Sequence, residues 1–81
     1  MQIALSRRAD KEYRKLPVQL QKQVDKQFNF LADNIRHPSL DAKKYSETDD
    51  IWQGRINRDY RFYFYIANDT YHILTIVPHP K

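Results

Sequence analysis

The clearest pattern of apolar and polar positions lies in residues 60–66, where the two kinds of residue alternate. A β-strand places alternate residues on opposite faces of a sheet, so this segment predicts a strand with two different faces. One face is apolar and is expected to contact a core; it carries Tyr60, Phe62, Phe64 and Ile66. The other face combines a cation with aromatic rings, in Arg61, Tyr63 and Tyr65. Such a combination can bind phosphate and stack on an unpaired base.

A short helix is predicted from residue 7 to residue 15. Ser6 stands where an N-cap would stand. The apolar residues that follow have helical spacing, at Ala9, Tyr13 and Leu16. Leu16 precedes Pro17, and a residue before proline avoids the helical region of backbone angles, so the helix is expected to end here.

A second, longer helix is predicted over residues 18–34. Its apolar residues recur every three or four positions, at Leu20, Val24, Phe28, Leu31 and Ile35. The polar side, which runs from Gln19 to Gln27, carries no ordered motif. We expect that side to be a solvated surface without chemistry.

Short apolar runs predict strands in four places: residues 2–5, 51–57, 60–67 and 71–77. The pairs 58–59 and 68–69 are predicted to be turns between the last three strands, and connections this short require antiparallel neighbours. Residues 38–50 show weak periodicity and mixed charge, so this segment is predicted to be a loop.

This order of elements, β-α-α-β-β-β, predicts an α+β fold. In it an antiparallel sheet of about four strands is packed on an N-terminal helical hairpin. The other face of the sheet can stay open to solvent or a partner. We expect residues 1–81 to form a single domain. The main core candidates are Trp52, Ile56, Phe62, Phe64, Leu74 and Ile76, although the facing of the last strand stays open.

Composition narrows the classes of function. The 81 residues include 14 Lys and Arg against 10 Asp and Glu, and the net charge of +4 favours a polyanionic or acidic partner. Without cysteine there is no disulfide or thiolate metal site, and a single glycine excludes a glycine-rich phosphate loop. Histidines and carboxylates lack metal-ligand spacing, so neither a metal nor a small-molecule cofactor is expected. No apolar run approaches the roughly 18 residues of a membrane span, so we expect a cytoplasmic protein without membrane contact.

Two residues are candidates for the chemistry of RNA cleavage. Cleavage without a metal requires proton transfer at two oxygens and stabilisation of the charge on phosphorus. Arg61 suits the second task, because a guanidinium stays charged and can bind two phosphate oxygens; the alternative is a cross-strand salt bridge to Asp59 or Glu47. His79 suits the first, because an unperturbed imidazole has a pKa of about 6.5; the alternative is a polar residue in an exposed tail.

Several features together resemble the RelE/ParE superfamily of toxins from type II toxin-antitoxin systems. They are the element order, Leu16-Pro17, the strand Trp52 to Arg55, the run Asp59-Tyr60-Arg61-Phe62-Tyr63 and the terminal segment from Val77 to Lys81. The resemblance covers almost the whole chain. It implies a ribosome-dependent mRNA endonuclease for a RelE-like member or a DNA gyrase inhibitor for a ParE-like member. In either case a small antitoxin protein would neutralise the toxin.

The resemblance also implies roles for particular residues. Arg61 matches the arginine that contacts the scissile phosphate in RelE-like toxins. Gln53 and Arg55 stand where those toxins have two alternating lysines, so one cation is kept and one is lost. His79 is the candidate match for the His or Lys of a terminal Gly-His-Arg or Gly-Lys-Arg segment. The arginine of that segment is absent unless Lys81 replaces it, and the later aromatic residue is missing.

From these patterns and the resemblance we predict a set of site residues. The candidate catalytic residues are Arg61, His79 and Arg55. The candidate RNA-binding residues are Lys43, Lys44, Gln53, Arg58, Tyr63, Tyr65 and Lys81. For Lys43 and Lys44 the alternative is a solvated pair in a surface loop.

The predicted partners are a cognate antitoxin and mRNA on the ribosome. An exposed basic and partly apolar surface suits an acidic or amphipathic segment that orders on binding, over the Arg61 face or along the helical hairpin. Three functions remain open: a metal-independent mRNA endonuclease, a gyrase inhibitor or other non-nucleolytic toxin, and a non-toxic relative that only binds.

Overall fold

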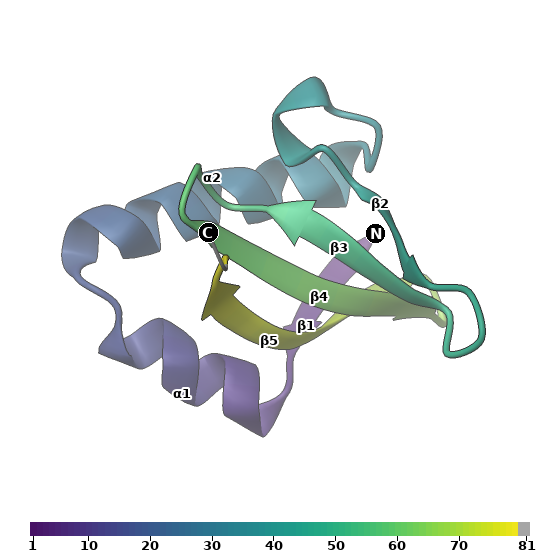
Figure 1. Ribbon diagram of the computed structural model, residues 1–81, viewed down its shortest axis with the longest axis horizontal. Coiled ribbons are helices and arrows are strands. Elements are labelled where there is room, and N and C mark those ends of the chain that lie inside the picture. The colour runs from purple at the N-terminus through teal and green to yellow at the C-terminus, as the bar shows by residue number, and fades with distance from the viewer. Residues whose placement is uncertain (80–81) are drawn as a thin grey trace.

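A five-stranded sheet with two helices beside it makes up the structure (Figure 1). This computed structural model describes residues 1–79. The elements are β1 (Gln2–Leu5), α1 (Arg7–Lys15), α2 (Val18–Asp33), the 3-10 helix η1 (Pro38–Leu40), β2 (Lys43–Ser46), β3 (Ile51–Arg55), β4 (Tyr60–Ala67) and β5 (Thr70–Pro78). In space the strands follow the order β1-β5-β4-β3-β2. The predicted α+β fold is therefore confirmed.

The sheet differs from the prediction in two respects. It has five strands instead of about four, because residues 43–46, predicted to be a loop, form β2 and pair with β3. It is also mixed, because β1 lies parallel to β5 while the other pairs are antiparallel. The short β2 contains a register shift between Lys44 and Ser46, so it has no run of alternation from which a strand could be predicted.

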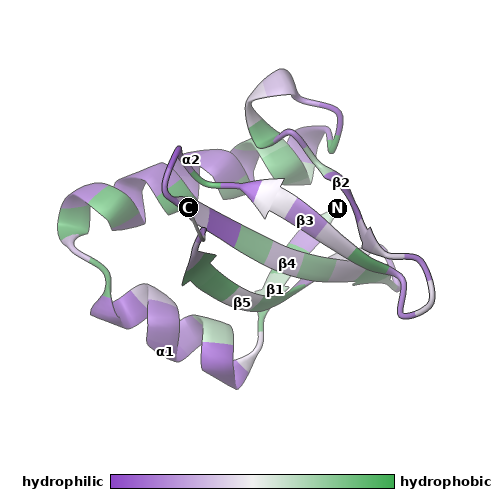
Figure 2. Ribbon diagram, in the orientation of Figure 1, coloured by the Kyte–Doolittle hydropathy of each residue, from purple (hydrophilic) through white to green (hydrophobic). Residues whose placement is uncertain are grey.

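One face of the sheet is covered by α2 and encloses the core. The ring of Phe28 on α2 meets Phe62 on β4 edge to face, with 5.1 Å between the ring centroids. The buried apolar residues are Ala9, Val24, Leu31, Leu40, Ile56, Phe62, Phe64, Tyr71, Ile73 and Ile76. Trp52, predicted to be in the core, is only partly buried and packs against it. Figure 2 shows apolar positions alternating with polar ones along β4.

The single glycine lies beneath the ring of Phe62. Gly54 on β3 is directly opposite Phe62 on β4. A β-carbon at position 54 would come within 3.0 Å of three carbons of the Phe62 ring. Glycine is therefore required at this point so that the ring can lie flat in the core.

A β-bulge in β5 changes which residues of that strand face the core. Tyr63 is opposite Thr75 and Phe64 is opposite Ile73, so Leu74 has no partner on β4. Ile73 and Ile76 consequently both point into the core. The prediction that Leu74 is a core residue was wrong for this reason.

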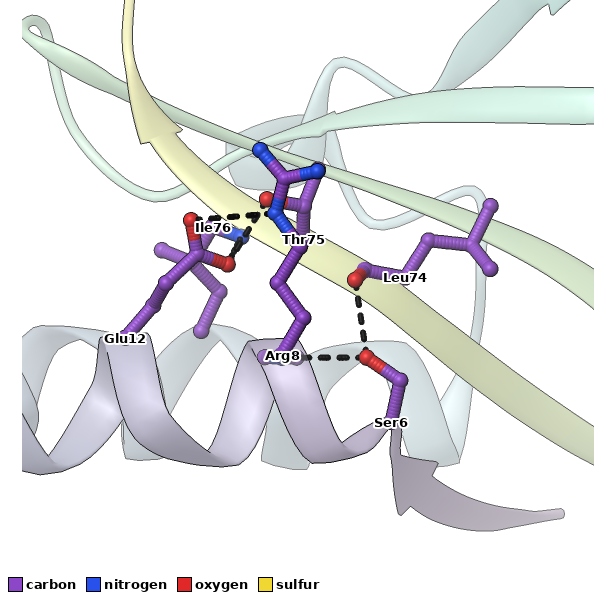
Figure 3. A network of polar contacts seen from close by, with 7 residues as sticks. Ser6, Arg8, Glu12, Leu74, Thr75 and Ile76 are labelled. Carbon is purple, nitrogen blue, oxygen red and sulfur yellow. Dashed lines mark hydrogen bonds and ion pairs between the residues drawn. The ribbon is translucent and has the colours of Figure 1, made fainter.

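Helix α1 and its N-cap cover the part of the β5 edge that β1 leaves unpaired. The parallel pairing of β1 with β5 stops at Ile73. Beyond it, the Ser6 hydroxyl donates to the Leu74 carbonyl at 2.8 Å. The Glu12 carboxylate accepts from the Ile76 backbone N–H at 3.1 Å and the Thr75 hydroxyl at 2.7 Å (Figure 3). These side chains satisfy backbone groups that the bare edge would otherwise leave open.

Ser6 is also the N-cap of α1, as predicted, since its Oγ accepts from the Ala9 N–H at 3.0 Å. Helix α2 ends one residue earlier than predicted, with Asn34 as its C-cap. Ile66, predicted to share the core face of β4, lies near the end of the strand and is 37% exposed, although Tyr71 opposite it on β5 is buried.

The expectation that the polar side of α2 is only a solvated surface was wrong for one residue. Gln27 is 3% exposed. Its amide nitrogen donates to the carbonyls of Ser39 at 3.0 Å and Arg55 at 2.8 Å, and its oxygen accepts from the Ser39 hydroxyl at 2.9 Å. A single buried amide thus ties α2 to η1 and to the end of β3.

Candidate functional site

Most of the predicted site residues lie on the face of the sheet opposite α2. Directly opposite residues of antiparallel strands share a face. One row of such residues crosses β2, β3 and β4 through Lys43, Gln53 and Tyr63, and a second row contains Arg55 and Arg61. We call this surface the open face; its residues are Lys43, Gln53, Arg55, Arg61, Tyr63 and Tyr65. In Figure 1, α2 lies behind the sheet and the open face is turned toward the viewer.

Arg61 is held by the turn that precedes it. One terminal nitrogen, Nη1, donates to the carbonyls of Asn57 at 2.6 Å, Tyr60 at 3.0 Å and Arg58 at 3.3 Å. Within residues 1–79, Arg61 forms no ion pair with Asp59 or Glu47, the alternative that the sequence left open. The side chain is therefore fixed through one nitrogen, while hydrogen bonds from Nη2 and Nε are absent from the described part of the chain. Those two nitrogens form the fork that binds two oxygens of a phosphate.

Asn57 organises the turn between β3 and β4. Its Oδ1 accepts from the backbone N–H groups of Asp59 at 2.8 Å and Tyr60 at 2.9 Å. Its Nδ2 donates to Gln23 on α2 at 2.6 Å. Asn57 thereby positions the carbonyls that hold Arg61. No site role was predicted for Asn57, although an asparagine in a turn commonly binds its own backbone two residues on.

His79 lies next to the same turn. Its backbone N–H donates to the Asp59 carbonyl at 2.7 Å, so the chain continues alongside β4 beyond Pro78. Tyr60 is opposite Pro78 and Arg61 is opposite Val77. This register places His79 across from Asp59. Because Asp59 precedes Arg61 by two residues, His79 lies on the same face as Arg61. The remaining terminal candidate, Lys81, lies outside the described residues.

Tyr63 forms the aromatic part of the open face together with Tyr45, which was not among the predicted site residues. Its ring meets Tyr45 of β2 edge to face, at 4.8 Å between centroids. Burial raises the pKa of Tyr63, the neighbouring Tyr45 raises it further, and Arg61 lowers it. The Tyr63 phenol therefore keeps its proton at neutral pH and can donate a hydrogen bond. Tyr45 was missed because its segment was predicted to be a loop.

Tyr65 lies farther along the open face. Its ring stacks on His72 of β5, with 4.7 Å between centroids and an angle of 10° between the planes. The residue is 37% exposed. Because four residues separate Tyr65 from Arg61 along an extended strand, about 13 Å, a base stacked on Tyr65 would belong to a different nucleotide from a phosphate on Arg61.

Lys44 is separated from the other candidates. It is opposite Trp52, whose neighbours belong to the core side of the sheet, and its ammonium lies 5.3 Å from the centroid of the Trp52 ring. The ammonium also binds the carboxylates of Asp50 and Glu47. The hydrogen bond to Asp50 is the main cause of its raised pKa. The structure thus brings Lys43, but not Lys44, onto the open face.

The two other basic candidates are exposed at the end of the sheet. Arg55 is the last residue of β3 and lies opposite Arg61. Two like charges on facing residues repel each other, which is typical of a surface that binds an anion between them. Arg58 lies in the turn that follows, and its carbonyl accepts from Arg61.

In residues 1–79, no three His, Asp or Glu side chains converge as a metal site would require. The described helices are too short or too polar to cross a membrane.

Comparison with known proteins gives structural relatives only. No protein-family model and no curated protein sequence matches the chain. A YoeB/ParE toxin from Agrobacterium tumefaciens superposes with a TM-score of 0.81 at 9% identity, over 99% of this chain and 100% of that one. A RelE-RelB complex from Pyrococcus horikoshii gives 0.78 at 18% identity, over 95% and 92%. A heterotetrameric YoeB-YefM toxin-antitoxin complex from Staphylococcus aureus gives 0.78 at 15% identity, over 99% and 98%.

These similarities confirm the predicted resemblance at the level of the fold. The chain has the fold of the RelE/ParE superfamily of toxins along nearly its entire length.

Proposed function

We propose that this protein is the toxin of a toxin-antitoxin pair and that it cuts mRNA on the ribosome, in the cytoplasm, as a metal-independent endoribonuclease. The observation that carries the proposal is the position of Arg61. Its guanidinium is fixed through Nη1 on the open face, opposite Arg55, with His79 beside the same turn. The RelE/ParE fold supports the proposal.

The proposed reaction is an attack of the ribose O2′ on the adjacent phosphorus. A bond forms between O2′ and phosphorus, and the bond from phosphorus to O5′ breaks, which leaves a 2′,3′-cyclic phosphate and a 5′-hydroxyl. Arg61 and Arg55 stabilise the additional negative charge on the phosphate oxygens in the transition state. They remain protonated, so neither supplies nor takes the proton.

Proton transfer falls to a different group. O2′ must lose a proton as it attacks, and O5′ must gain one as it leaves. His79 takes the O2′ proton, because the neutral imidazole has a nitrogen that can act as a general base, and solvent supplies the proton for O5′. Tyr63, the base-stacking candidate, stays neutral because burial raises its pKa. It holds the nucleotide without entering the proton transfer.

The test is cleavage of a defined mRNA in a purified translating system. Arg61→Ala should lower the rate of cleavage by roughly a hundredfold or more, the usual effect of removing one preorganised group that binds the transition-state charge. Arg14→Ala is the matched control, since Arg14 is an exposed arginine on α1, paired with Asp10. Naked mRNA without ribosomes should remain intact. Equal cleavage by the Arg61→Ala and unchanged proteins would refute the site.

A non-nucleolytic toxin is the alternative, and one observation favours it. Three hydrogen bonds from Arg61 to turn carbonyls also suit a residue that only shapes the turn for contact with a protein target. Intact mRNA at protein concentrations that stop growth would support this alternative, and DNA gyrase is the first target to examine.

We propose a small antitoxin protein as the partner, because RelE and YoeB relatives form complexes with RelB and YefM antitoxins. An acidic or amphipathic segment would order on the open face, where exposed cations and aromatic rings lie together. Its binding should protect the open face from hydrogen exchange and prevent mRNA cleavage. An adjacent small gene product that changes neither property would contradict this proposal.

A further inference from the structure

A second basic site lies beside the open face, between α2 and the turn that joins β3 to β4. It is a pocket of about 390 Å³. The charged side chains that line it are Lys26 of α2, Arg55 of β3 and Arg58 of the turn. Ser39 of η1 also lines the pocket, as do the amide side chains of Asn57 and Gln27.

The walls of this pocket are fixed by buried and cross-linked amides. Gln27, almost completely buried, ties the Ser39 and Arg55 carbonyls to α2. Asn57 is tied to Gln23 of α2 at 2.6 Å. Two separate amide links thus hold the turn and the end of β3 against the helix. The cations are therefore carried by a rigid frame, which lowers the cost of ordering them around a ligand.

The pocket has an unbalanced positive charge. Its lining includes three cations and no carboxylate. Within residues 1–79, Lys26, Arg55 and Arg58 have no ion pair, whereas Arg8, Arg14, Lys43 and Lys44 do. The Lys26 ammonium lies 5.9 Å from the centroid of the Phe30 ring. Three uncompensated cations around a polar cavity are suited to an anion.

We propose that this pocket binds a phosphate of the RNA backbone adjacent to the phosphate held by Arg61. The proposal rests on the function proposed above and extends the binding site to Lys26, which lies on the side of α2 for which no chemistry was predicted. The two sites are joined through one residue. Asn57 lines the pocket, and its carbonyl accepts from Arg61 Nη1. Arg55 lies at the rim between the pocket and the open face, so one polynucleotide can contact both sites.

The experiment measures binding separately from cleavage. The probe is a fluorescein-labelled single-stranded RNA with 2′-O-methyl groups throughout, which has no free 2′-hydroxyl to attack phosphorus. Its affinity for the purified protein is measured by fluorescence anisotropy over a series of salt concentrations. The test variant is Lys26→Gln/Arg58→Gln. The matched control is Lys11→Gln/Lys15→Gln, which removes the same charge from exposed positions on α1.

The test variant should weaken binding on the order of fivefold at about 100 mM salt, with a salt dependence shallower by about 0.7, the value for one lost phosphate contact on a single strand. The control should keep the salt dependence of the unchanged protein. Lys26→Arg, which conserves the charge, should also keep it. Circular dichroism of each variant checks the fold.

The outcomes separate this proposal from the nuclease proposal. Equal affinity and salt dependence for the test variant and the unchanged protein would overturn the pocket as a phosphate site, as would equal losses in the test and control variants. A specific loss in the test variant supports the pocket even if mRNA stays intact on the ribosome, in which case only the nuclease proposal fails. No binding of the probe by the unchanged protein would overturn the pocket as a phosphate site, while the nuclease proposal would still be decided by cleavage on the ribosome.

Discussion

Strand β4 places neighbouring residues in two different environments. On the face covered by α2, Phe62 and Phe64 have no exposed surface. On the open face, Arg61 and Tyr63 are half-buried and Tyr65 is 37% exposed. The covered face consists of rings that pack on one another and on Phe28. The open face combines cations and hydroxyls with rings.

The two faces of this strand therefore have different roles, since one supports the fold and the other is available to a ligand. A buried ring contributes to stability through the apolar surface that it removes from water. A half-buried arginine contributes little to stability but keeps donors available for a ligand. Substitutions on β4 should therefore affect folding and chemistry separately, even though adjacent residues are only one peptide bond apart.

The largest expected effect comes from removing a ring on the covered face. Phe62→Ala should lower the free energy of unfolding by about 3–5 kcal/mol, because a cavity remains where the ring packed between Phe28 and Gly54. Total stabilities of about 5–15 kcal/mol are usual for domains, so this variant should be close to unfolded. Urea denaturation followed by the fluorescence of Trp52, the single tryptophan, measures the change.

Arg61→Ala gives the contrast on the same strand. It removes hydrogen bonds to turn carbonyls that stay accessible to water, so the loss of stability should be about 1 kcal/mol. A loss of stability as large as that of Phe62→Ala would contradict this contrast between the two faces. It would show that Arg61 is a structural residue of the turn.

An effect between those of Phe62→Ala and Arg61→Ala is expected at the edge of β5, on whose bulge the arrangement of both faces depends. Glu12→Ala should cost about 1–3 kcal/mol, because the Ile76 N–H and the Thr75 hydroxyl lose their acceptor. Glu12→Gln keeps an oxygen there and should cost less. The exposed pair with Arg8, at 3.7 Å, contributes little. Equal losses in the two variants, measured by urea denaturation, would show that the charge matters and the edge hydrogen bonds do not.

The same contrast explains how far the sequence could predict the structure. The bounds of β4, Tyr60–Ala67, follow directly from alternation, because this strand has one buried and one open face. The bulge at Leu74 could not be predicted, because side chains far away in the sequence satisfy the backbone groups around it. Ser6 donates to the Leu74 carbonyl, and Glu12 accepts from the Ile76 N–H.

The candidate site was predictable to a similar extent. Alternation places Arg61 and Tyr63 on one face once β4 is recognised. Tyr45 and the separation of Lys43 from Lys44 depend on the pairing of β2, a strand of four residues with an irregular register. Gln27 belongs to a polar side whose spacing does not indicate which residue meets the end of a strand. Each of these features depends on contacts between segments that are distant in the sequence, and a local pattern of residues does not reveal such contacts.

The smallest expected effect concerns pH and the tyrosines of the two faces. Burial alone raises the pKa of Tyr71, which is 4% exposed on the covered face. For Tyr63 on the open face, burial and the neighbouring Tyr45 raise the pKa, and Arg61 opposes the change to a smaller extent. In both cases the folded protein keeps the phenolic proton at a pH where the unfolded chain, with a pKa of about 10, has lost it. The contribution is therefore fully present below pH 10 and is lost as the pH rises further.

Tyr71→Phe should accordingly make the free energy of unfolding less dependent on pH above about pH 10. The limit for one group is about 1.4 kcal/mol per pH unit. Between pH 7 and 9 the dependence should match that of the unchanged protein, which serves as the internal control. Tyr63→Phe should also reduce this dependence, because burial and the neighbouring Tyr45 together raise the pKa of Tyr63 by more than Arg61 lowers it. Urea denaturation at a series of pH values measures all three proteins. An unchanged pH dependence in the Tyr71→Phe protein would contradict the prediction that the buried phenol contributes to stability.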